Sequence, residues 1–391
     1  MTSEDNIFSF GDSSDPMQQA REALRAVQHY QQDWQEEGVN RVYKYFDDVE
    51  GDWLEEFEPI LVNGSAEYKS RVTVSAICEQ LRSLGLSTSF IKNMAFPSWW
   101  KSELESDEGA ISQLLNSLSR RLFLKVNFSQ NSDLSLAFLP IPATKFKLQK
   151  SQEDPQLFSY LARSIANAVS STIEQAYFSI PSEALSIRQS ILQRESSVNL
   201  DSLLDFCWGV GIPVVHFDKQ PDGHVKSDGL VVMSGRRPVI LIGSSRKQSA
   251  WLLFILAHEL GHIAKGHLQE GILVDESFLR GVNDDEEDTA NQFAAQLLFG
   301  DVPLQWAANL NKNRLLAKAR CLSEEHNLDS GALILNYGWQ TKNWGCAVAA
   351  LNLLEPTAKA PARINAYYQR HLVSIDEDRR DYLQQVDVLA A

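Results

Sequence analysis

Cysteine is scarce in this chain of 391 residues, and no two of its four cysteines form a CxxC pair. Small secreted domains that depend on disulfides, and zinc ribbons that depend on paired thiolates, are therefore excluded. Isolated thiols are typical of a reducing compartment, so we expect a cytoplasmic protein. The four are Cys78, Cys207, Cys321 and Cys346.

Long apolar runs are also missing. The longest, from Trp251 to Ala257, is much shorter than the roughly 20 residues that a membrane-spanning helix needs. The first residues, Met1 to Asn6, are acidic and polar, whereas a secretory signal begins with positive charge. We therefore expect a soluble protein without a membrane segment or a signal peptide.

Positive charge is in deficit, with 36 Lys and Arg against 51 Asp and Glu and a net charge of −15. Residues 1–60 hold fifteen acidic and four basic side chains, so most of the imbalance lies there. Such a region repels nucleic acid, and its simplest role is that of a solubilising extension. The rest of the chain is nearly neutral.

What remains is ordinary globular composition, with 44% hydrophobic and 22% charged residues. We predict an α+β, mainly helical protein, and the length allows for two or three folded domains. A polar segment at 149–156 with a single proline is the best linker. The predicted regions are an acidic, partly disordered N-terminal region (1–66), a helical or mixed domain (67–155), a core (156–310) and a C-terminal helical region (311–391).

The segment from Val72 to Met94 has helical spacing that is interrupted at Gly85, which resembles a weak helix-turn-helix unit. Leu81 stands where such units have a small residue, and Pro97 shortens the second helix. The pattern therefore favours a structural or protein-docking role over direct contact with nucleic acid.

The most informative motif is His258-Glu-Leu-Gly-His262. On a helix, residues four apart share a face, so His258 and His262 can offer two imidazoles to one metal ion. Glu259 projects about 100° round the axis, from where its carboxylate can reach a water at the metal. This is the HExxH arrangement of zinc peptidases. A solvated helix edge is the alternative, but the apolar run before the motif places the histidines at a buried helix end.

A catalytic zinc ion usually has three protein ligands and one open position. Residues 284–298 begin with an acidic cluster and continue with apolar residues at helical spacing, as expected where a helix dipole favours negative charge. Glu287 and Asn291 share a face, so Glu287 can bind the metal while Asn291 hydrogen-bonds a histidine ligand. The other candidates for the third ligand are Asp285, Glu286 and Asp288.

His267 competes for the same role. Metzincins use HExxHxxGxxH, but this chain has Lys265 and Leu268 where that pattern requires glycine and histidine. The register fails, and we expect His267 to end the helix, where a cationic side chain meets the negative end of the dipole.

The two segments, Ala257–His262 and Glu287–Leu298, together resemble the ImmA/IrrE family of zinc metallo-endopeptidases, a gluzincin-like group associated with mobile elements, stress responses and defence systems. The resemblance extends over roughly residues 196–345. One departure is the late proline, Pro303, where the family usually has one soon after the Leu-Leu pair. The resemblance assigns the metal ligands and the general base to His258, His262, Glu287 and Glu259.

The resemblance also implies a fold, in which a small strand layer packs on the HExxH helix of a minimal metallopeptidase core. Short apolar segments at 211–217, 229–233 and 238–242 fit such strands. Residues 322–338 are similar to a helix-turn-helix-like unit that often follows the core.

The function implied is that of a zinc-dependent endopeptidase that cleaves one regulatory protein, a helix-turn-helix repressor or an antitoxin. The alternative is a non-proteolytic, metal-binding regulatory protein that docks DNA or a partner. The intact Glu259 favours the enzyme, because proton transfer is its main use. Candidates for an oxyanion-stabilising group are His326, Tyr337, Tyr367 and Tyr368.

Overall fold

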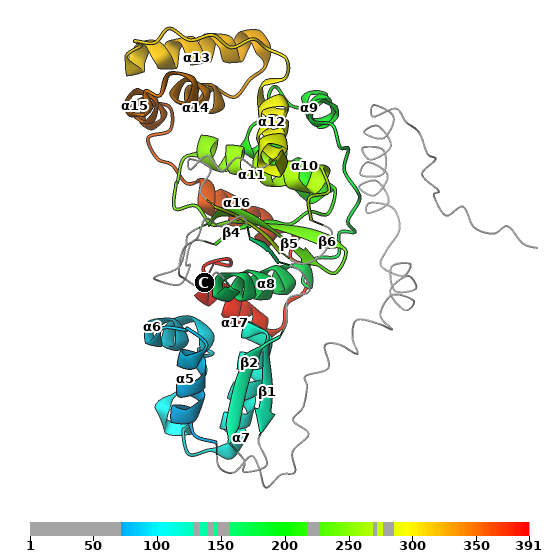
Figure 1. Ribbon diagram of the computed structural model, residues 1–391, viewed down its shortest axis with the longest axis vertical. Coiled ribbons are helices and arrows are strands. Elements are labelled where there is room, and N and C mark those ends of the chain that lie inside the picture. The colour runs from blue at the N-terminus through cyan, green and yellow to red at the C-terminus, as the bar shows by residue number, and fades with distance from the viewer. Residues whose placement is uncertain are drawn as a thin grey trace, which may run out of the picture.

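The computed structural model describes residues 72–128, 133–139, 144–146, 156–217, 227–268, 272–276 and 285–390. The acidic region predicted at 1–66 lies outside these residues. Figure 1 shows the described elements stacked along the long axis, with the larger sheet in the middle, helices at one end, and helices with a two-stranded hairpin at the other.

The N-terminal end has its own apolar core. Helix α5 (Val74–Ser83) is followed by α6 (Thr88–Phe90) and a π-helical turn, η1 (Ile91–Ala95), and then by a 3-10 turn, η2 (Ser102–Leu104). Helix α7 (Glu108–Leu122) leads directly into an antiparallel hairpin of β1 (Leu124–Phe128) and β2 (Leu134–Phe138).

The predicted break at Gly85 is confirmed, because its φ of +90° forms the turn between α5 and α6. Leu81 is fully buried in the N-terminal core. The second helix ends just before Pro97, as the proline predicts.

The central sheet has the strand order β3-β7-β5-β6-β4. Its middle strand, β5, is antiparallel to both neighbours, whereas the outer pairs are parallel. The strands are β3 (Thr144–Phe146), β4 (Val214–His216), β5 (Ser227–Ser234), β6 (Arg237–Ile242) and β7 (Ile272–Glu276). The three strands predicted from apolar runs are β4, β5 and β6, and the α+β, mainly helical fold is confirmed. The pairing of β3 with β7 has no counterpart in the sequence analysis.

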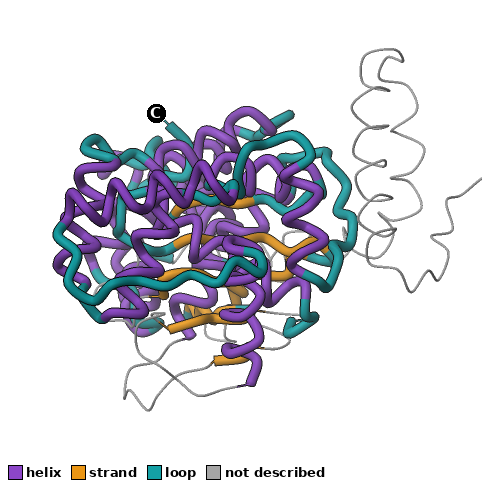
Figure 2. Tube along the Cα trace, turned by 90° about the horizontal axis from the view of Figure 1, so that it is seen from above, coloured by secondary structure: helices purple, strands orange, loops and turns teal. Residues whose placement is uncertain are grey.

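Helices cover the sheet on both faces (Figure 1), and the view from above shows the strands enclosed by helices (Figure 2). Helix α8 (Gln156–Ser170) packs on β5 and β6 from one side, and α11 (Ser249–Ala264) packs on the same strands from the other. The other helices are α9 (Ala184–Leu192), α10 (Leu200–Gly209), α12 (Asp285–Phe299), α13 (Lys312–His326), α14 (Ser330–Thr341), α15 (Trp344–Leu354), α16 (Ala360–His371) and α17 (Glu377–Gln385).

The main apolar core runs from Phe158 to Leu389 and includes residues on both sides of the predicted boundary at 310/311. Helix α16 packs along β4, where the Asn365 side chain accepts from the His216 amide and donates to its carbonyl. One amide side chain thereby satisfies both backbone groups at this sheet edge. The boundaries between regions remain predictions. Of the helices that the structure describes, none has the length and apolar content to cross a membrane.

Candidate metal centre

Helix α11 carries the HExxH motif and is buried along almost its whole length. Its N-terminus has no side-chain cap of its own. Instead, Glu355, just after α15, accepts from the Ser249 amide at 2.7 Å and from the Ser249 hydroxyl at 2.9 Å. A carboxylate at this position accepts a hydrogen bond from a free amide and interacts favourably with the positive end of the helix dipole. The C-terminal part of the chain thus fixes the start of the helix that carries the histidines.

The other end of α11 closes with a glycine turn. Gly266 has a φ of +68°, its amide donates to the Ile263 carbonyl, and the His267 amide donates to the His262 carbonyl at 3.0 Å. This pair of bonds is the Schellman motif, which stops the helix and reverses the chain. The turn brings the His267 ring beside His262.

Three candidate ligand groups converge at the centre of the molecule. His258 Nε2 lies 3.2 Å from Glu287 Oε2, His262 Nε2 lies 3.4 Å from Glu287 Oε1, and the two Nε2 atoms are 3.0 Å apart. The ligand atoms of the three residues all lie within 4.8 Å of one another, and all three residues are buried. Two imidazoles and one carboxylate form the donor set of many catalytic zinc sites.

Helices α11 and α12 come close enough for this because Gly261 has no side chain. A methyl group added there would lie 3.2 Å from the Ala290 backbone and from Phe293 Cβ, tighter than most packing contacts. Gly261 therefore allows α12, which carries Glu287, to pack close to the two histidines.

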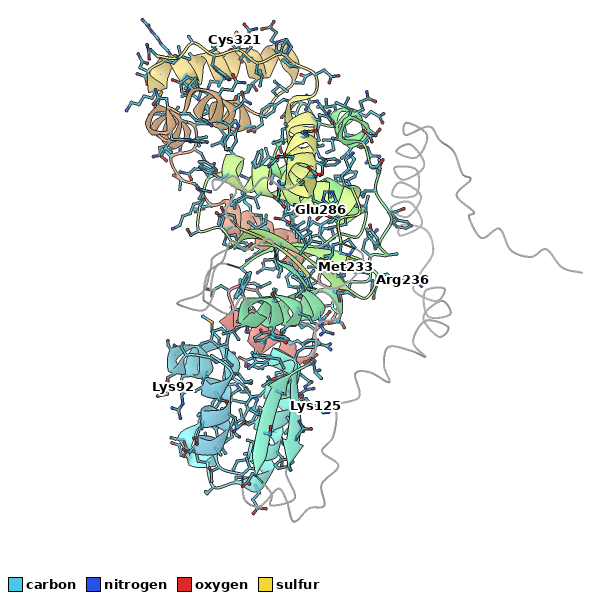
Figure 3. All side chains as sticks on the ribbon, in the orientation of Figure 1. Lys92, Lys125, Met233, Arg236, Glu286 and Cys321 are labelled. Atoms are coloured by element: carbon cyan, nitrogen blue, oxygen red, sulfur yellow. The ribbon has the colours of Figure 1, made fainter. Side chains whose placement is uncertain are left out.

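Burial distinguishes the acidic candidates on α12. Glu287 is 7% exposed and faces both histidines, whereas Asp285 and Asp288 are exposed and Glu286 is half-buried. Figure 3 marks Glu286 near the end of α12 that is closer to the sheet. The geometry singles out Glu287 among the four.

A hydrogen bond to Asn291 holds the outer nitrogen of His258, with 3.0 Å between His258 Nδ1 and Asn291 Oδ1. Because a carbonyl oxygen only accepts, Nδ1 carries the proton and Nε2 keeps its lone pair. The contact that the sequence predicts for Asn291 is therefore present.

A second chain of hydrogen bonds does the same for His262. The Thr289 hydroxyl donates to the Glu286 carbonyl, so it accepts from His267 Nε2, at 3.3 Å. His267 Nδ1 lies 2.8 Å from His262 Nδ1, so one of the two nitrogens donates to the other. A neutral His262 that donates from Nδ1 presents the lone pair of Nε2, as a metal ligand requires.

His267 thus lies at the helix end, as predicted, and its ring contacts His262. The expected role as a cation beside the last carbonyls stays a prediction. The signal in the sequence was Gly266, because a glycine after the last helical residue favours the turn that returns the next side chain to the helix.

Glu259 is 1% exposed and lies against the middle strand of the sheet. Gly229 on β5 provides the room for it. A methyl group added at Gly229 would lie 2.9 Å from Glu259 Cδ and 2.8 Å from Ile255 Cγ2. The backbone of β5 therefore limits how far the Glu259 carboxylate can lie from the metal centre.

The four candidates for an oxyanion-stabilising group make their contacts elsewhere. The Tyr337 hydroxyl donates to the Ala308 carbonyl, that of Tyr367 to the Asp201 carbonyl, and that of Tyr368 pairs with Thr172. His326 lies 3.6 Å from the neighbouring Glu325. The prediction that one of them serves the site has no support from these contacts.

Residues 210–321 match the family model described as the IrrE N-terminal-like domain, a peptidase family designated M78. The match includes the three candidate ligands His258, His262 and Glu287, together with Glu259 and Asn291, and it confirms the resemblance to the ImmA/IrrE family. It supports a metallopeptidase type of function. Comparison with curated proteins and with solved structures gave no match.

Proposed function

We propose, on the premise that residues 210–321 form an IrrE-like peptidase domain, that this protein is a zinc-dependent endopeptidase. Its metal ligands are His258, His262 and Glu287, and its general base is Glu259. The observation that carries the proposal is the convergence of the three ligand atoms within 4.8 Å, beside the buried Glu259.

A bound zinc ion supplies Lewis-acid chemistry, by which water becomes acidic near neutral pH and a peptide carbonyl is polarised. Glu259 accepts the proton of the attacking water and later delivers it to the leaving amine. Asn291 and His267 keep the two imidazoles in the tautomer that presents Nε2 to the metal. The Gly229 backbone lies against the Glu259 carboxylate and helps to position it.

The substrate we propose is a single regulatory protein, a helix-turn-helix repressor or antitoxin, cut in the cytoplasm during a stress or defence response. The family resemblance supports this class of substrate.

Zinc content and cleavage test the proposal together. The protein should bind about one zinc ion per chain, and it should cut the protein encoded beside it at a defined bond, detected by mass spectrometry. Glu259→Gln should keep the zinc and lose the cut. Zinc binding with no cleavage of that partner or of any peptide would instead support the alternative, a metal-binding regulatory protein.

A matched pair on α12 tests the third ligand. Glu287→Gln should lose zinc, whereas Glu286→Gln, one residue earlier and half-buried, should retain it. The reverse result would move the assignment to Glu286.

A further inference from the structure

Beside the metal centre lies a groove with a volume of about 330 Å³. It is bounded by α11, α12, α14 and α15, so both the predicted core and the C-terminal region contribute to it. The volume is at the lower end of the roughly 300–1,000 Å³ found for ligand pockets, a size that suits one or two side chains better than a large cofactor.

Five of the twelve residues that line the groove are aromatic. Trp251 and Trp344 stack with ring centroids 5.7 Å apart, and Trp339 meets Trp344 edge to face at 6.4 Å. Phe254 and Phe299 are the other two, and Ala295, Ala332 and Leu335 add aliphatic surface. Trp339 is 43% exposed, and an exposed tryptophan in the wall of a groove is typical of an interaction site.

The groove lies next to the metal centre. Phe254 lies one helical turn before His258, and the two rings are stacked at 6.5 Å. Asn291 lines the groove and hydrogen-bonds His258, while Asp288 lines it directly after Glu287. An extended chain advances about 3.3 Å per residue, so a side chain one or two residues from the metal reaches Phe254.

Two of the tryptophan rings already carry a cation from the protein itself. Arg246 lies 4.0 Å from the centroid of Trp251, and Lys342 lies 4.4 Å from that of Trp339. Cation–π contacts at these two rings are therefore made within the protein, and Asp288 is the one charged residue among the described residues of the lining. A large uncharged side chain gains from every ring it covers.

We propose that this groove is the specificity pocket of the peptidase and receives a bulky apolar side chain of the substrate, such as Leu, Met or Phe, next to the bond that is cut. The inference rests on the proposed function. Its substrate class is an extended segment that exposes such a residue, which in a folded repressor requires local unfolding.

Peptide binding tests the pocket without any need for turnover. The protein is zinc-loaded Glu259→Gln, and the probes are fluorescein-labelled Gly-Ser peptides that differ in one residue, Phe, Leu, Lys or Ala. Fluorescence anisotropy should show that the Phe and Leu peptides bind at least about tenfold more tightly than the Ala and Lys peptides. Equal binding of all four would overturn the inference.

Two variants test whether the preference for Phe and Leu peptides arises in the groove. Ala295 is exposed on α12 and lines the groove, so Ala295→Phe should fill it and remove the preference for Phe while zinc content stays the same. Trp339→Ala should weaken binding of the Phe peptide severalfold. Trp99→Ala is the control, since Trp99 is 38% exposed and lies in the N-terminal end. Unchanged binding by both groove variants would also overturn the inference.

Cleavage of the same peptides by the zinc-loaded wild-type protein separates the two proposals. If the wild type cleaves the peptides but Ala295→Phe does not change which peptides are cleaved, the specificity pocket is contradicted and the peptidase proposal is not. Selective binding by the Glu259→Gln protein, with no cleavage by the wild type, would leave the pocket as a peptide-binding site and sink the peptidase.

Discussion

Gly229 shows how one absent side chain can control a reaction. Its backbone lies against Ile255 and the Glu259 carboxylate, so Gly229→Ala should push the carboxylate out of place. A misplacement of about 1 Å costs on the order of 100-fold in rate, and we expect a loss of about 10- to 100-fold in kcat with zinc content unchanged. Gly345→Ala is the control, because a methyl group there meets nothing within 4 Å. Full activity of the Gly229 variant would show that β5 does not position the base.

The hydrogen bonds to the Nδ1 atoms of His258 and His262 lead to a separate prediction, which concerns zinc affinity. Asn291→Ala and His267→Ala each leave one ligand tautomer unfixed, and zinc affinity should fall roughly 10- to 100-fold in either variant. Competition with a chromophoric chelator measures this affinity without relying on activity. His326→Ala is the control, since that histidine ends α13 and lies beside Glu325. If His267→Ala binds zinc as tightly as the wild type, its contact with His262 is only packing.

At the scale of elements, α11 and α12 could be predicted because their chemistry is local. The apolar run and the HExxH spacing define one helix, and the acidic first turn defines the start of the other. The pairing of β3 with β7 could not be predicted, because Phe146 and Val274 are brought together only by the tertiary fold. The same holds for Gly229, whose contact with Glu259 appears only when the strand lies against the helix.

The contact between Glu355 and the N-terminus of α11 leads to a prediction about stability. Glu355→Ala would leave the Ser249 amide and hydroxyl without their carboxylate, so the free energy of unfolding should fall by about 1 kcal/mol. Chemical denaturation measures it. Glu325→Ala removes an exposed acid at the end of α13 and should change the stability by less than about 0.5 kcal/mol. Equal stabilities of the two variants would mean that solvent replaces the cap.

Across the whole molecule, segments near the C-terminus contact elements from several parts of the fold. Glu355 caps α11, Asn365 completes the edge at β4, and α17 contacts the N-terminal end. Sequence patterns predicted helices in this region but not these three contacts, because each contact joins residues far apart in the chain. The metal centre is the opposite case, since its residues lie within 34 positions of one another and follow a local pattern.

The contact between α17 and the N-terminal end depends on Arg121, which is 2% exposed. Its Nη2 lies 2.8 Å from Asp378 Oδ1 and 2.6 Å from Asp381 Oδ2, and its Nη1 donates to Gln385 Oε1. Burial alone would raise the pKa of Asp381, but hydrogen bonds from Ser98 and Arg121 outweigh it and hold the pKa below its ordinary value. A lowered pKa stabilises the fold above the ordinary Asp value, about 3.9, and this contribution is lost as the pH falls through the folded pKa.

Arg121→Met should therefore cost about 3 kcal/mol at neutral pH, since it leaves two carboxylates facing an apolar side chain. Arg120→Met is the matched control. Arg120 is adjacent and 3.6 Å from Asp378, but its side chain is 60% exposed, so its loss should cost less than about 1 kcal/mol. Chemical denaturation at pH 7 and at pH 3 measures both variants, and the gap between wild type and Arg121→Met should narrow at the lower pH. Similar losses for the two variants would show that a surface ion pair, and not a buried contact, joins α17 to the N-terminal end.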